Sequence, residues 1–217
     1  SDGGTERALS NITTHFPEEW EIDILVNSDK RIDYPFKGNI ITLEVDEEPK
    51  TGSVWFQFKV FIKRVIKLRY LKRIGNYQAC VSFLDSANIA NVLSGKRKCK
   101  VILSVRNSLK QSAKLPQYKY IVNPLVRILY NYSDGVVAVS EGVRRELLSY
   151  FRLKKDKVTA IENGYDLKAI RQQAEQKEND GIVDLFPGHK VIITAGRLTG
   201  QKGQWHLIRA FTEIIKQ

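Results

Sequence analysis

The chain has 217 residues, of which 42% are hydrophobic, and its formal net charge is +11. This composition excludes a disordered chain, and the sequence holds no apolar run long enough for a transmembrane helix. Two cysteines and three scattered histidines show no metal-ligand spacing, so we expect reduced thiols and no metal site.

The hydrophobic pattern predicts helices and strands in alternation along the chain. A helix follows Gly3-Gly4. Strands are predicted over 21–27, 39–45, 78–84, 99–105, 135–139, 157–161 and 190–195, and helices over 55–74, 87–93, 118–130, 141–150, 167–176 and from Lys202-Gly203 onwards. Asn163-Gly164 predicts a turn with a positive backbone angle. Near-continuous apolar strands between helices predict an α/β fold, a Rossmann-like parallel sheet with helices on both faces. Ligands of such sheets bind beyond the carboxyl ends of the strands.

The charge is unevenly distributed. Residues 1–50 hold 12 acidic and 5 basic residues, whereas residues 51–217 hold 12 acidic and 30 basic ones. Between Asp85 and Asp134 there are nine bases and no acid. Such a field favours an anionic partner: a nucleotide, a phospholipid surface or a nucleic acid.

The predicted helix 55–74 carries seven bases and no acid. Five apolar positions fall on one helical stripe, with Ile62 and Ile66 beside it; the stripe comprises Val54, Phe58, Phe61, Val65 and Leu68. Two interpretations stay open. The helix could lie on an anionic membrane surface, or it could cover the sheet with its bases solvated, and the two are compatible.

Two glycine-containing loops are candidate phosphate sites. Gly196-Arg197 ends the strand 190–195, and Lys202-Gly203 opens the next helix, so two cations stand beside a helix N-terminus. The alternative is a pair of ordinary solvated cations. Gly3-Gly4 would let backbone N–H groups approach a phosphate or an acceptor, or would simply form a helix-start turn.

Five segments, in this order, resemble the retaining glycosyltransferases of family 4, which have the GT-B fold of two facing Rossmann-like domains. The segments are residues 3–7, 82–91, 134–144, 161–166, and 196–198 with 202–203. The resemblance implies an acceptor-side Rossmann-like domain over residues 1–165 that lacks its first strand. It further implies a linker region over 166–188 and, over 189–217, the first strand and helix of a truncated donor domain.

The resemblance implies transfer of a sugar from a UDP- or GDP-linked donor to a glycan or polyprenyl-linked acceptor in bacterial surface polysaccharide biosynthesis. The resemblance also implies that the reaction retains configuration. It would need neither metal nor cofactor, because Gly196, Arg197 and Lys202 would bind the donor diphosphate. A hexosyltransferase of this kind is expected in the cytoplasm or on the inner face of the plasma membrane, with helix 55–74 as the membrane contact.

Two departures from the family pattern matter. Arg106 stands where many members carry a histidine; it can bind a phosphate or an acceptor carboxylate but cannot act as a base. The family's Glu-x7-Glu motif would lie beyond Gln217, so we expect the catalytic residues there and the chain as given to be incomplete and inactive alone. The alternative function is a non-catalytic basic domain that binds an anionic membrane or nucleic acid, although no nucleic-acid-binding motif occurs.

Overall fold

The computed structural model describes residues 4–28, 32, 34–43, 54–112, 116, 118–175, 188, 190–196, 198, 200 and 202–215. The chain divides into two compact units, Ser1–Tyr165 and Asp166–Gln217. Gly3 and Arg197 lie outside the described residues.

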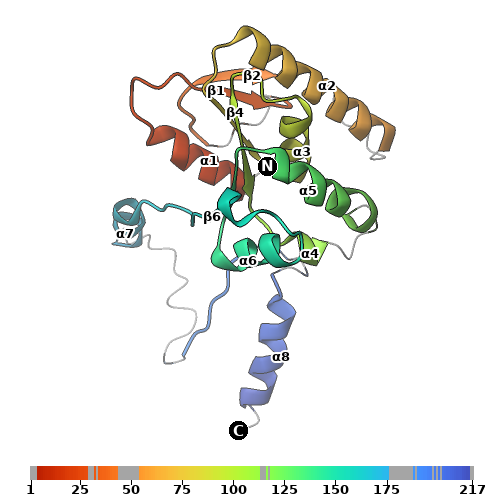
Figure 1. The fold of residues 1–217 in the computed structure, drawn as a ribbon. Coiled ribbons are helices and arrows are strands. Elements are labelled where there is room, and N and C mark those ends of the chain that lie inside the picture. The colour runs from red at the N-terminus through yellow and green to blue at the C-terminus, as the bar shows by residue number, and fades with distance from the viewer. Residues whose placement is uncertain are drawn as a thin grey trace. The chain divides into compact units, whose positions relative to one another are not determined.

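The described part of the first unit alternates strands and helices (Figure 1). Its strands are β1 (Asp23–Val26), β2 (Asn39–Thr42), β3 (Ala79–Phe83), β4 (Lys100–Val105), β5 (Gly135–Ala138) and β6 (Val158–Ala160). Its helices are α1 (Gly4–Thr14), α2 (Val54–Ile74), α3 (Asp85–Leu93), α4 (Leu109–Ser112), α5 (Asn123–Leu129) and α6 (Glu141–Ser149). Short turns of helix are the π turn η1 (Tyr118–Val122) and the 3₁₀ turns η2 (Tyr130–Tyr132) and η3 (Lys155–Lys157).

Four strands form a parallel sheet in the order β3-β4-β5-β6, and β1 pairs with β2 in a separate parallel pair. Helices separate the four strands, so each connection is a crossover, and right-handed crossovers stepping in one direction place α3, α5 and α6 on one face. In Figure 1, α1 lies on the other side of the strands from α5. The predicted α/β fold of parallel strands flanked by helices is therefore confirmed.

The apolar core lies between the sheet and this helical layer. Val101, Leu103 and Val105 of β4 are fully or almost fully buried, as are Val126 of α5 and Leu147 of α6. Consecutive residues of a strand point to opposite faces, and Leu103, Ser104 and Val105 of β4 are all buried. Both faces of β4 are therefore covered, which explains its near-continuous apolar sequence.

A buried hydrogen-bond network joins α3 to the sheet. The side-chain amide of Asn88 donates to the Ser104 carbonyl (3.1 Å) and to the Tyr130 hydroxyl (3.2 Å), and its oxygen accepts from Ser82 Oγ (2.8 Å). Asn91 Nδ2 donates to the Cys80 carbonyl at 2.9 Å. Both asparagines are fully buried. The segment 82–91, a sequence motif above, therefore positions α3 on β3 and β4.

Lys72 connects α2 to the end of α3. Its Nζ donates to the backbone and side-chain oxygens of Asn91 (2.9 and 2.7 Å), to Ser94 Oγ (2.8 Å) and to the Gly95 carbonyl (2.9 Å). Burial lowers the pKa of Lys72, but a positive charge at a helix C-terminus is favourable. Lys72 thus sets which face of α2 turns toward α3.

The predicted inward stripe of α2 is only partly correct. Phe61, Val65 and Leu68 are half-buried, but Val54 and Phe58 are exposed. The hydrogen bonds of Lys72 turn the side of α2 that carries this lysine toward α3. The predicted stripe lies across the boundary of that side, so some of its residues face inward and others face outward.

The second unit contains α7 (Leu167–Glu175) and α8 (Gln204–Ile215). Asp166 accepts from the Ala169 amide at 3.0 Å, as expected of a helix cap. The predicted strand 190–195 is wrong, since these residues form no strand. A strand needs a hydrogen-bonded neighbour, and the described residues of this unit include no other strand.

Other predicted boundaries also shift. Helix 118–130 is divided into η1, α5 and η2, and α4 was not predicted. The predicted strand 39–45 ends at Thr42, and residues 44–45 lie outside the described part.

Replacing Asn88 with alanine should lower the free energy of unfolding by about 2–4 kcal/mol, because three buried polar groups lose its amide. Urea unfolding followed by circular dichroism measures the change. The control is Asn76→Ala, an exposed asparagine that should change stability by less than about 0.5 kcal/mol. Equal effects of the two substitutions would contradict a structural role for the network.

Candidate functional site at the carboxyl edge of the sheet

The carboxyl ends of β3 to β6 lie at one edge of the sheet because the four strands are parallel. Leu84 follows β3, Arg106 follows β4, and Ser140, two residues after β5, caps the start of α6. Asn163 lies three residues after β6. These four residues therefore follow the strand ends where ligands of parallel sheets bind, and two of them, Arg106 and Asn163, are in contact.

Arg106 is at the centre of this edge. Its Nη2 donates to Asn163 Oδ1, and its guanidinium carbon lies 5.9 Å from the centre of the Phe83 ring. Burial lowers the pKa of Arg106, yet an arginine remains charged at neutral pH. The guanidinium is thus held by a neutral oxygen and an aromatic face, which position its charge without neutralising it.

A second arginine, Arg64 of α2, contacts the start of α3 and the carboxyl end of β1. Nη1 donates to Ser86 Oγ in the first turn of α3, and Nη2 donates to Asn27 Oδ1 just after β1, each at 3.0 Å. Burial lowers the pKa of Arg64 as well. Arg64 is one of seven bases in this helix, and nothing in the local sequence pattern distinguishes it from the others.

The turn from β3 into α3 is strained at Leu84, whose φ is 73° and ψ is 152°. A side chain with a Cβ rarely adopts this conformation, which costs on the order of 1–3 kcal/mol. Leu84 is also 48% exposed, so the strain does not serve to bury the side chain. Strained backbone of this kind clusters at functional sites, and no local residue pattern predicts it here.

The loop after β6 also contacts α1. Asn11 Nδ2 donates to the Gly164 carbonyl at 3.4 Å. The predicted positive φ at Asn163-Gly164 is wrong, since neither residue has one. The contacts with Arg106 and Asn11 hold this segment without a left-handed residue. Gly4 begins α1, and a Cβ there would meet open space, so packing does not require this glycine.

In the second unit, the structure brings Gly196 and Lys202 together. A Cβ added at Gly196 would lie 3.6 Å from Lys202 Cδ, and Gln204 Nε2 donates to the Gly196 carbonyl at 3.4 Å. Gly196 and Gly203 have φ values of 155° and 65°, and Gly203 immediately precedes α8. The exposed side chain of Lys202 therefore lies beside the end of segment 190–196 and near a helix N-terminus.

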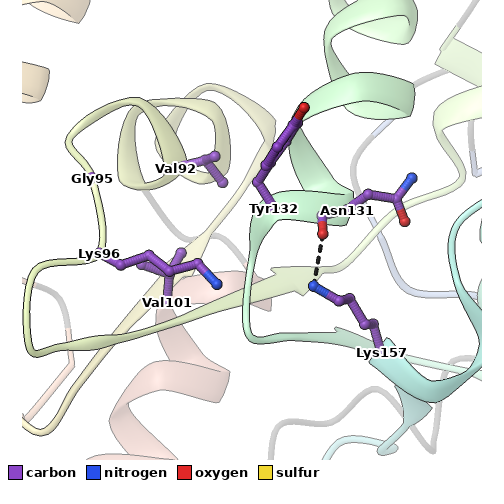
Figure 2. A pocket seen from close by; sticks show the side chains of 7 residues that line it. All are labelled: Val92, Gly95, Lys96, Val101, Asn131, Tyr132 and Lys157. Carbon is purple, nitrogen blue, oxygen red and sulfur yellow. Dashed lines mark hydrogen bonds between the residues drawn. The ribbon is translucent and has the colours of Figure 1, made fainter.

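A hollow of about 400 Å³ lies at the opposite edge of the sheet, where β4 to β6 begin (Figure 2). Lys96 and Lys157 line it, but both ammonium groups already have partners. Lys157 Nζ donates to the carbonyls of Asn131 and Ser133, each at 2.7 Å, and Lys96 Nζ pairs with Asp134 at 2.7 Å. Both lysines therefore stabilise the loops at the amino ends of the strands rather than offering their charge to a ligand. We accordingly favour the carboxyl edge as the site.

Residues 2–169 match Glycosyltransferase Family 4. The chain belongs to this family. It is 27% identical over 180 residues to the uncharacterized glycosyltransferase MJ1059 of Methanocaldococcus jannaschii, which covers 79% of this chain and 44% of that protein. It is 33% identical over 91 residues to MJ1607 of the same organism, also named an uncharacterized glycosyltransferase, which covers 39% of this chain and 23% of that protein. The chain thus spans less than half the length of these relatives.

The match covers every element of the carboxyl edge in this family 4 chain, from α1 to the segment after β6. It ends before Gly196 and Lys202, so the assignment of these residues to a donor site stays a prediction.

The strain at Leu84 can be tested by comparing two substitutions. Both Leu84→Gly and Leu84→Ala remove the side chain, but only glycine relieves the backbone, so we expect the glycine variant to be more stable by about 1 kcal/mol. Leu93, similarly exposed at the end of α3, is the control. There, alanine should be more stable than glycine by about 0.5–1 kcal/mol. Thermal unfolding of the four variants measures both differences, and the same order at the two positions would show that Leu84 is unstrained.

Proposed function

We propose that the protein is a glycosyltransferase that moves a sugar, of the hexosyl type, from a UDP- or GDP-linked donor to a glycan or lipid-linked acceptor. The match to Glycosyltransferase Family 4 over residues 2–169 is the observation that carries this proposal. We further propose retention of configuration, independence of metals and cofactors, and a role in bacterial surface polysaccharide biosynthesis. The cytoplasm or the inner face of the membrane is the proposed location.

In such a reaction the bond between the anomeric carbon and the diphosphate oxygen breaks, and negative charge develops on the leaving diphosphate. Cations held near those oxygens before the reaction stabilise this charge. Arg197 would bind two phosphate oxygens with its forked guanidinium, and Lys202 would add a point charge. The position of the Lys202 side chain beside Gly196 supports the assignment of this lysine.

On the acceptor side, Arg106 is the proposed binding group. Its contacts with Asn163 and Phe83 hold it in one place, and its permanent charge suits a phosphate or carboxylate on the acceptor. Because a guanidinium does not release its proton near neutral pH, Arg106 would bind and orient rather than act as a base.

For the donor site, we expect Arg197→Ala and Lys202→Ala each to lower kcat/KM for the nucleotide-sugar by about 10- to 100-fold, because each removes a charge-assisted hydrogen bond. The measurement is steady-state transfer by the complete protein, after a panel of UDP- and GDP-sugars has identified the donor. Arg209→Ala on α8 is a matched control, since Arg209 lies over the Trp205 ring, and should change kcat/KM less than about twofold. Unchanged kinetics in both loop variants would refute the diphosphate assignment.

For the acceptor site, Arg106→Ala should raise KM for the acceptor about tenfold or more while leaving KM for the donor within about twofold. Arg145→Ala, an exposed arginine of α6, serves as the control. A rise in donor KM instead would assign Arg106 to the donor. Nucleotide-sugar binding without any transfer would favour a non-catalytic role, and salt-sensitive retention of DNA would favour nucleic-acid binding.

A further inference from the structure

Helix α2 has a second apolar face, which points away from α3. Its exposed large side chains recur every three or four residues, so they form one stripe along the helix. We call this the α2 stripe, and it consists of Trp55, Phe58, Ile62, Ile66, Tyr70 and Ile74. Trp55 is 71% exposed, Ile66 62% and Ile74 60%. A continuous apolar surface of this kind marks an interaction site.

The inward face of the same helix is firmly attached, so the α2 stripe has a defined orientation. Lys72 donates four hydrogen bonds around the end of α3, and Arg64 bridges Ser86 and Asn27. Phe61 packs against the apolar core. Rotating the helix to bury the stripe would break these contacts.

The charged side chains that α2 itself places beside the stripe are all basic. Lys59, Lys63, Arg69 and Arg73 are exposed on α2, and the helix contains no acid. An apolar strip flanked only by bases complements a surface that is apolar below and anionic above, which describes the headgroup region of an anionic bilayer. An acidic groove of a protein would also pair with these bases. It would not require an apolar stripe along a helix of 21 residues, about 31 Å long, with Trp55 and Tyr70 on it.

From this arrangement we infer that the α2 stripe docks the protein on an anionic phospholipid surface, with the stripe at the acyl boundary and the flanking bases among the phosphates. The helix lies in the interface rather than across it, since none of the helices in the described ranges is long and apolar enough to span a membrane. This surface extends the proposed function to acceptors presented by lipid, but the docking needs neither donor nor transfer.

The test is co-sedimentation of the complete protein with vesicles of phosphatidylcholine alone or with added phosphatidylglycerol, without any nucleotide-sugar. We expect binding only with the anionic lipid, and weaker binding as salt rises. The double variant Lys59→Gln, Lys63→Gln should bind about 30-fold more weakly, at about fivefold per lysine. The control is Lys154→Gln, Lys155→Gln, which removes the same charge from exposed positions outside α2 and should change binding less than about twofold.

The apolar contribution is tested separately. Ile66→Ser should weaken vesicle binding about tenfold or more, whereas Ile128→Ser on α5, a position of similar exposure, should not change it. Unchanged circular dichroism would confirm that both variants fold.

Equal binding to neutral and anionic vesicles, or binding unaffected by the α2 variants, overturns the inference. So does a dimer in analytical ultracentrifugation that Ile66→Ser dissociates while the protein ignores vesicles, because the stripe would then cover a second copy. Loss of transfer with intact vesicle binding would count against the proposed function alone.

Discussion

The first unit depends on the hydrogen bonds that two buried asparagines make between α3 and the sheet. Asn88 joins the helix to β4 and to Tyr130, and Asn91 joins it to β3. An amide buried without partners would destabilise the fold, so this helix has one favourable position and rotation. Apolar packing alone is less directional and would allow neighbouring arrangements.

The position of α3 determines what happens at both of its ends. At its start, the chain must turn directly from β3 into the helix, and Leu84 takes a strained conformation there. At its end, backbone and side-chain oxygens gather around Lys72, which attaches α2. The strained turn at the candidate site and the outward direction of the α2 stripe thus have a common origin in the packing of one short helix.

The chemistry of the carboxyl edge rests on cations held by neutral groups. Arg64 contacts amide and hydroxyl oxygens, and Arg106 contacts an amide oxygen and an aromatic ring. A carboxylate in these places would hold the guanidinium equally well but would cancel its field. Neutral partners leave the charge available to an anionic ligand. In the second unit, the Lys202 side chain likewise lies beside Gly196, whose carbonyl accepts a hydrogen bond from Gln204.

The sequence by itself determined the order of the elements and the fold class. Apolar runs such as that of β4 are continuous because the strand is covered on both faces, and Ser140 and Asp166 are local caps whose bonds span only three residues. Tertiary structure decided what depends on distant partners. The inward face of α2 follows from Lys72 binding α3, the position of Arg106 follows from Asn163, and segment 190–195 forms no strand because a strand exists only beside another. The periodicity of one segment shows where its apolar residues recur, but not which neighbouring element they will contact.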